Sequence, residues 1–450
     1  MKNIRQFLKA NKILVISYII GLSIQILFIL GFNIYNWISQ IPRNSLLFEF
    51  FRTSLEPYQD YQIWYKSFVD NFVHEGWIPY SFSFPDSELY TDWFSYFWDL
   101  FVGIRQYYYV YPPFFLYIIS LPGLFHVNLI FIPLLTATNL LPIVIYKFLS
   151  NSFNQKVAEW GFLATSLCPL LIFYNGGLLL NTSVVALFFV ITLYLISIQK
   201  FKIACIFLSI SFLFKQIILF FILPALFYMV LKSCRKGEEK FILHYIKKLV
   251  LYSSLIIGTF LIGSLPWILL NPTRYINSIF LTQSVRFDPA FITPQHNTPV
   301  HWYSFLVALE LPYWVLYIVG FLNFTSIGII ITEILAVILL HYWYSHDKLN
   351  WIRFLDLIVF TALLSHLFFP RGVYKYYFTF IVPLVILWLA SYYYNDLTSK
   401  NNKNLRLLCY FISISIAIIL IPRFYYLLLI WSVLILMIRK TSYQLKKIEV

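Results

Sequence analysis

Long apolar segments alternate along the chain with short breaks that contain Pro, Asn, Gly or basic residues. The apolar segments fall near residues 13–32, 108–125, 127–147, 157–174, 182–198, 201–214, 216–231, 247–270, 314–343, 354–370, 373–394, 405–421 and 423–438. A membrane-spanning helix needs about 20 predominantly apolar residues, and most of these segments reach or approach that length. The pattern therefore predicts an all-α polytopic membrane protein.

The basic residues in the breaks predict the topology. Of the 33 Lys and Arg, 23 lie in the segments 1–12, 146–158, 199–202, 232–248, 345–353, 395–406 and 439–450. Cytoplasmic loops are enriched in Lys and Arg, so we expect these segments in the cytoplasm. The assignment requires residues 108–147 to cross the membrane only once, with the proline-rich part before residue 126 dipping into the outer face. About 12 transmembrane helices follow, with both termini inside.

Two large extracytoplasmic loops are expected, at residues 35–107 and 271–313. The first holds nine of the nineteen acidic residues against four basic ones, which gives it a net charge of −5. In the second, the apolar stretch 302–311 is too short to span and favours an amphipathic helix at the interface. Residues 1–394 are expected to form the transmembrane body, and residues 395–450 a C-terminal transmembrane hairpin with a cytoplasmic tail.

The composition excludes a soluble enzyme. The chain is 60% apolar and 12% charged, whereas soluble domains have about 45–50% apolar and about 25% charged residues. The net charge of +14 does not indicate nucleic acid, because the basic residues form short clusters between apolar runs. The four cysteines form no CxxC pair, which argues against a disulfide framework or a zinc site.

Several short motifs follow one another in and after the first outer loop. Asp60 precedes Trp64 and Tyr65, a Gly-x-x-x-Tyr turn occupies 76–80, and Tyr-Pro-Pro stands at 111–113. In this order the motifs resemble those of membrane glycosyltransferases of the C superfamily, which use a polyprenyl-phosphate sugar as donor. A 25-residue insertion that includes Asp86, Asp92 and Asp99 separates the second motif from the third.

Three downstream matches extend the resemblance to about residues 10–395. The run Asn175-Gly176-Gly177 to Asn181 stands where relatives carry a Gly-Gln-Asn/Asp signature, although Gln and Asp are absent here. Lys215 with Pro224 resembles the Lys-Pro pattern of a mid-chain helix in these enzymes. The segment 370–377 resembles the basic, aromatic entry into a late helix.

The resemblance implies a role for each matching residue, whereas Arg286 and Asp92 stand outside the matching motifs and are candidates because of their place in the outer loops. Asp60 is expected to be the catalytic base. The residues expected to bind the donor phosphate are Arg286, Arg371, Lys375 and Lys215. Those expected to bind the rest of the substrates are Trp64, Tyr65, Tyr111, Asp92 and Asn181.

The chemistry of inverting transfer explains these residue types. One base removes the proton of the acceptor hydroxyl, while the leaving phosphate needs charge stabilisation, which Arg supplies well. We expect no cofactor and no metal. The expected partners are a polyprenyl- or dolichyl-phosphate sugar, a lipid-linked or glycan acceptor and membrane lipids, at the extracytoplasmic face of the plasma membrane or the endoplasmic reticulum. The sugar, a hexose such as mannose, follows from the resemblance alone.

Other interpretations of the same residues remain open. Asp60 and Asp92 are solvated carboxylates in an acidic loop if they have no site role, and Arg371 and Lys375 serve equally well as interfacial anchors beside tyrosines. A snorkelling side chain accounts for Lys215. The alternative functions are a polytopic transporter or lipid-linked sugar flippase, whose ionisable groups lie near the membrane midplane in broken helices, and a polysaccharide ligase or polymerase.

Overall fold

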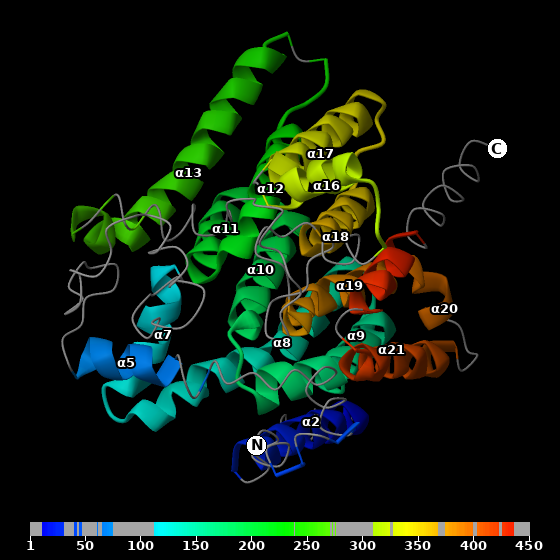
Figure 1. Ribbon diagram of the computed structural model, residues 1–450. Helices are drawn as coiled ribbons and strands as arrows, with labels where there is room; N and C mark the ends of the chain where they lie inside the picture. The colour runs from blue at the N-terminus through cyan, green and yellow to red at the C-terminus, as the bar shows by residue number, and fades with distance from the viewer. Residues whose placement is uncertain are drawn as a thin grey trace, which may run out of the picture.

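The computed structural model describes most of the hydrophobic body of the protein. The residues described are 11–30, 40–42, 45–46, 61, 65–74, 112–237, 239–270, 272, 275, 309–324, 327–367, 374–398, 403–422 and 425–435. Every regular element within these ranges is a helix (Figure 1). The expectation of an all-α protein is therefore confirmed for this part of the chain.

The first half of the chain forms the following helices. They are α2 (Lys12–Leu30), α5 (Lys66–Val73), α7 (Pro113–Gly123), η3 (Val127–Ile130), α8 (Phe131–Ser152), α9 (Gln155–Ser166), η4 (Leu171–Gly177), α10 (Thr182–Ser197), α11 (Phe201–Phe214), η5 (Gln216–Ile218) and α12 (Leu219–Ser233).

The second half forms α13 (Phe241–Leu270), α16 (Tyr313–Phe324), α17 (Ile327–Ser345), α18 (Trp351–Leu367), η8 (Lys375–Tyr377), α19 (Phe378–Tyr392), α20 (Tyr394–Thr398) and α21 (Lys403–Leu420). A further apolar helix runs over Tyr425–Ile435.

Six of the described helices are long and apolar enough to cross a membrane, and a seventh arises if α9 and η4 count as one bent span. Five shorter apolar helices of 10–17 residues accompany them. Large apolar side chains stand exposed on the outer helices, for example Ile262 and Leu269 on α13, which are 77% and 74% exposed. Soluble proteins rarely present such surfaces, so the fold is that of a membrane protein.

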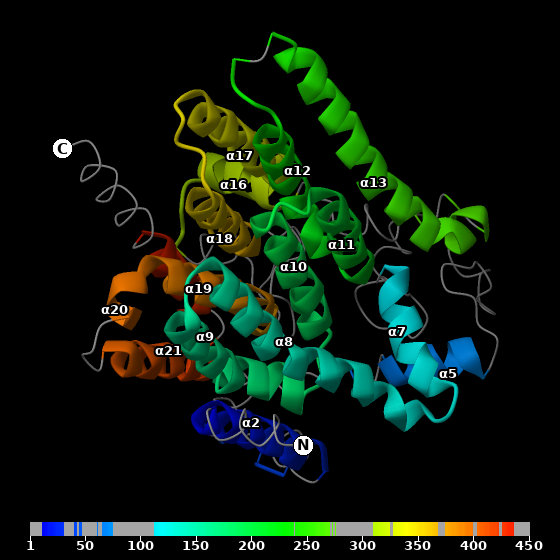
Figure 2. The same cartoon turned by 180° about the vertical axis from the view of Figure 1, so that it is seen from behind.

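The core lies where α8, α10, α11, α12, α18 and α19 pack against one another. In both views α10 runs through the middle of this group, whereas α2 and α13 lie at its periphery (Figures 1 and 2). Phe189, Phe221 and Phe380, from three of the central helices, are all buried, and their ring centroids are 4.8 to 5.7 Å apart. Each such aromatic pair stabilises the fold by about 0.5–1.5 kcal/mol beyond the contribution of the apolar area that it buries.

Two apolar segments of the sequence each contain two described helices. The segment 157–174 bends by 56° between α9 and η4, and Pro169 explains the break because proline lacks the N–H that a continuous helix requires. The segment 314–343 contains the two described helices α16 and α17.

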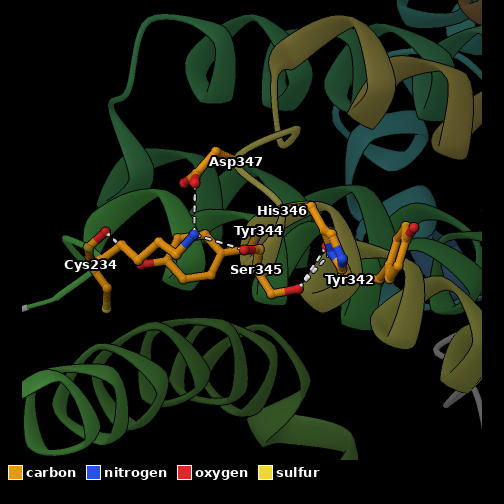
Figure 3. A network of polar contacts seen from close by, with 7 residues as sticks. Cys234, Tyr342, Tyr344, Ser345, His346 and Asp347 are labelled. Atoms are coloured by element: carbon orange, nitrogen blue, oxygen red, sulfur yellow. Dashed lines mark hydrogen bonds and ion pairs between the residues drawn. The ribbon is translucent and has the colours of Figure 1, made fainter. Parts of the chain in front are cut away.

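A network of polar contacts joins two turns at one end of the bundle (Figure 3). The Nζ of Lys236, after α12, lies 2.7 Å from Asp347 Oδ2, after α17, and also donates to Ser345 O. Tyr344 OH donates to Cys234 O. These contacts hold the turn after α12 beside the turn after α17, and both turns belong to basic segments of the sequence.

The starts of several central helices lie at the opposite end. Because α12 ends at the basic turn, its start and the adjoining end of α11 lie at the other end of the bundle. The helix α10 precedes α11 through a short turn at 198–200, so its start also lies there. The start of α19 joins them, since Thr182 Oγ1 is 2.6 Å from Thr379 Oγ1. This end contains the polar groups described below.

The segment around α5 packs on α7 and η3. Tyr61 OH donates to Asn128 O over 3.2 Å, and Phe68 and Val69 of α5 are buried. A Cβ added at Gly123 would come within 2.2 Å of Val69 Cγ1, so glycine allows this close approach. The helix α5 is thereby attached to the segment that leads into α8.

Candidate functional site

Four chain segments bring polar side chains together at the end of the bundle opposite the basic turns. Asn175 comes from η4, Asn181 and Thr182 from the start of α10, Lys215 from the junction of α11 and η5, and Thr379 from the start of α19. Each of these residues is at least 93% buried. We call these five residues, together with Tyr376 and Tyr377, the Lys215 cluster.

Irregular backbone places the two asparagines in the cluster. The segment η4 is a π-helix, in which Leu178 N–H bonds to Phe173 O, five residues back. Leu179 then has a positive φ of 54°. π-Helical turns are rare and concentrate at functional sites, and non-glycine residues with a positive φ are uncommon. The backbone is therefore irregular between Asn175 and Asn181.

Asn175 is the point on which two threonines converge. Its Oδ1 lies 2.7 Å from Thr182 Oγ1 and 3.1 Å from Thr379 Oγ1. The two threonine hydroxyls are also within 2.6 Å of each other. This arrangement connects η4, α10 and α19 through buried polar groups, and such networks order the elements that they join.

Asn181 stands at the N-cap of α10 but does not cap it. Asparagine is among the preferred N-cap residues because its oxygen accepts an N–H of the first turn. Here the side chain makes no such bond, and its Oδ1 accepts instead from Lys215 Nζ over 3.2 Å. The side chain orients a cation rather than the helix terminus.

The helix break at Lys215 brings its ammonium group against aromatic rings. The backbone is extended there, with φ −160° and ψ 138°, so α11 ends and the lysine side chain turns into the bundle. Its Nζ lies 4.2 Å from the ring centroid of Tyr377 and 5.3 Å from that of Tyr376. Tyrosine faces attract cations, and the attraction grows when water is excluded.

The cluster presents several hydrogen-bond donors. The side-chain Nδ2 atoms of Asn175 and Asn181 are buried and have no hydrogen-bond partner among the described residues. With the ammonium of Lys215 they make a set of donors and positive charge. Buried donors are costly unless they are paired, so the chemistry of this set suits an anionic oxygen ligand such as a phosphate.

Lys375 makes a different set of contacts. Its Nζ donates to Ile419 O over 3.0 Å and also to Ile421 O, at the end of α21, and the side chain is fully buried. A cation at a helix C-terminus is stabilised by the free carbonyl groups there. The structure thus assigns Lys375 an anchoring contact with α21, while the phosphate role inferred from the sequence stays a prediction.

Tyr65, directly before α5, packs into the core against α7. Its ring is fully buried and lies edge-on to Phe115, with centroids 4.8 Å apart. Beside it, Lys66 Nζ is 5.2 Å from the ring centroid of Tyr61. Burial raises the pKa of Tyr61 to about 12, and partial burial lowers the pKa of Lys66.

The remaining residues expected at the site lie outside the described part of the chain. They are Asp60, Trp64, Asp92, Tyr111, Arg286 and Arg371. Of the four that are described, Lys215 and Asn181 are in direct contact, whereas Lys375 and Tyr65 make the other contacts given above. The sequence motif included Asn175 without a role, and Thr182 and Thr379 were missed altogether. Thr182 follows Asn181 directly in an Asn-Thr-Ser triplet.

Comparisons with known proteins add no family assignment. No sequence model of a known protein family matches the chain, and no curated protein matches it either.

Proposed function

We propose that the protein is a membrane glycosyltransferase that moves a hexose from a polyprenyl-phosphate donor to a lipid-linked or glycan acceptor at the extracytoplasmic face. The observation that carries the proposal is the buried contact of Lys215 with Asn181 and the tyrosine rings. It lies at the end of the bundle away from the basic turns. Basic turns are typical of the cytoplasmic side, which supports an outward-facing position for this end.

The depth of the cluster suits a lipid phosphate. The helix α10 has 16 residues and α19 has 15, which at 1.5 Å per residue separates the cluster from the basic turns by about 22–24 Å. The hydrocarbon core is about 30 Å thick. The proposal therefore puts the Lys215 cluster near the outer boundary of the hydrocarbon, where the phosphate of a prenyl lipid resides.

The topology expected from the sequence forms part of the proposal. The helix α7 has 11 residues, about 16 Å in length, and is too short to cross alone. We propose that α7, η3 and α8 together make one of twelve crossings, with outer loops at 35–107 and 271–313.

The proposed reaction needs a general base and a set of cationic side chains. Asp60 takes the proton of the acceptor hydroxyl, whose oxygen attacks the anomeric carbon. The bond from that carbon to the phosphate oxygen breaks, and its electron pair leaves with the polyprenyl phosphate. Lys215, together with Arg286 and Arg371, stabilises the charge that develops on this leaving group. Such stabilisation accelerates the reaction because the donors are already in place.

A transfer assay tests the proposal. Membranes that contain the protein are supplied with radiolabelled polyprenyl-phosphate mannose or glucose, and extracted lipids and glycans are examined for label. Transfer that depends on the intact chain and is lost in Lys215→Met supports the proposal. If neither donor gives transfer to any lipid or glycan fraction, the proposed activity is wrong for these sugars.

A second candidate is a transporter or lipid flippase. The break between α9 and η4, bent by 56°, and the break at Lys215 favour it, because transporters bind their substrates at broken helices. Transporter sites lie near the membrane midplane, however, whereas Lys215 stands at helix ends. Movement of a fluorescent prenyl-phosphate sugar across proteoliposomes, without any transfer of sugar, would favour this candidate.

A further inference from the structure

The helix α2 contacts the rest of the protein through glycine and amide residues. A Cβ added at Gly21 of α2 would meet Ser166 O at 2.4 Å, so the helix approaches the backbone at the end of α9 closely. Four residues later, Gln25 is 4% exposed, and its Oε1 accepts from Asn139 Nδ2 over 2.9 Å. Only 17% of the apolar window of α2 is buried, so these few contacts determine its position.

Gln25 also reaches the π-helical segment that carries Asn175. A Cβ added at Gly176 would lie 2.2 Å from Gln25 Cγ, and one added at Gly177 would lie 3.1 Å from Phe28 Cγ. The ring of Phe28 meets Phe173 edge-on at 6.2 Å. The side chains of α2 therefore occupy the space that the two glycines leave open.

These contacts adjoin the Lys215 cluster directly. Gly176 follows Asn175, whose Oδ1 accepts hydrogen bonds from Thr182 and Thr379. In the same turn, Asn181 accepts a hydrogen bond from Lys215. On the other side, α2 leads into the loop that contains Asp60. The contacts of α2 thus connect the start of that loop with the cluster.

We propose that Gln25 is a positioning residue that holds the turn 175–181 in register with α2. The hydrogen bond to Asn139 of α8 holds the Gln25 side chain, and the side chain in turn holds the backbone at Gly176. The inference that Gln25 positions a catalytic site rests on the proposed function. The inference that Gln25 positions the turn 175–181 is independent of that function.

Two substitutions separate shape from hydrogen bonding. Gln25→Met preserves the length of the side chain against Gly176 but removes the bond to Asn139. Gly176→Ala drives a methyl group into the Gln25 side chain, and the double variant Gly176→Ala/Gln25→Ala removes the collision. Ser17→Ala is the matched control, because Ser17 is buried on α2 and its hydroxyl, within the described part of the chain, bonds to Leu14 O of the same helix alone.

The first readout does not depend on the proposed function. A cysteine at Leu178, which is partly buried in the turn, is placed in a Cys409→Ser background, and its reaction rate with a small thiol reagent is measured on solubilised protein. We expect a roughly three- to tenfold change in rate for Gln25→Met and for Gly176→Ala, since a lost buried hydrogen bond shifts local equilibria by about that factor. The double variant should differ little from Gln25→Ala, and Ser17→Ala should match the parent.

The second readout concerns the site. Binding of geranylgeranyl phosphate is measured for the same variants. Weaker binding in Gln25→Met, at an unchanged melting temperature, is the result expected of a positioning residue. Unchanged reactivity at position 178 in both Gln25→Met and Gly176→Ala would overturn the inference. If reactivity changes while even the parent binds no prenyl phosphate, the positioning of the turn stands and the proposed function falls.

Discussion

Asn181 Oδ1 accepts a hydrogen bond from Lys215 Nζ over 3.2 Å, although the two residues are 34 positions apart. The asparagine stands at the start of α10 and the lysine at the end of α11, and these helices are antiparallel neighbours. The contact therefore lies where two helix ends meet. It orients the ammonium between a carbonyl oxygen and the face of Tyr377.

Loss of this ammonium should affect ligand binding. We expect Lys215→Met to weaken binding of geranylgeranyl phosphate by about 10- to 100-fold, the equivalent of one charge-assisted hydrogen bond. Lys200→Met is the matched control, because Lys200 is an exposed lysine just before the other end of α11. Titration of the two purified variants with geranylgeranyl phosphate measures both affinities. Equal affinities of Lys215→Met and Lys200→Met would show that Lys215 does not belong to the binding site.

Lys375 should behave differently from Lys215. Replacing it by Met leaves the carbonyl groups of Ile419 and Ile421 without its ammonium, so we expect a lower melting temperature. Because these contacts lie on α21, the affinity for prenyl phosphate should stay within about twofold. A thermal melt and a titration on the same preparation measure both quantities. Weaker binding at an unchanged melting temperature would instead support the phosphate role inferred from the sequence.

Asp60→Asn keeps the shape of the side chain but removes its basicity. If Asp60 is the general base, the rate of sugar transfer should fall by about 10²–10⁴, with normal insertion of the protein in the membrane. Asp70→Asn is the control, since Asp70 is an exposed acid on α5 of the same loop. A single-turnover transfer assay on both variants gives the comparison, and wild-type turnover in Asp60→Asn would exclude the role.

The proposed topology predicts which positions react from outside. Cysteines at Ser150, Ser233 and His346 should be shielded from an impermeant reagent added to intact cells, because all three adjoin basic segments. The contact of Lys236 with Asp347 requires that the last two positions share one side. A cysteine at Leu124, which is 60% exposed, should react. Labelling at Ser150 or Ser233 would show that residues 108–147 cross twice.

Alkaline pH should loosen the attachment of α5 to α7. The pKa of Tyr61 is raised from 10.0 to about 12 in the folded protein, so its contribution is complete below pH 10.0 and is lost as the pH rises to about 12. The lowered pKa of Lys66 acts in the opposite sense, because raising the pH removes the cost of burying its charge.

The reactivity of a cysteine at Val73, which is partly buried in α5, reports this loosening. We expect its rate to rise between pH 10.0 and about 12 in the parent and to rise less in Tyr61→Phe, which lacks the titrating hydroxyl. An identical rise in both proteins would show that Tyr61 is not the group responsible.

The sequence alone determined the class of fold and the approximate position of nearly every helix. Apolar runs of this length indicate membrane-spanning segments, and such a segment forms a helix because it must satisfy its own backbone hydrogen bonds inside the membrane. The segments 182–198 and 201–214 differ by no more than one residue at either end from α10 and α11. The Asn-Gly-Gly run was also visible as a break, whereas the break at Pro169 falls inside the apolar segment 157–174 and was not predicted.

Only the tertiary structure decided which polar groups meet. Asn175, Asn181, Lys215 and Thr379 come from four segments up to 204 residues apart, and helix packing, not spacing along the chain, brings them together. Lys215 and Lys375 looked equivalent in the sequence, since both are lysines beside an apolar run. One contacts tyrosine faces and an amide, and the other contacts the carbonyl groups of α21. The direction of a side chain depends on the helix that packs against it, and that neighbour lies far away in the sequence.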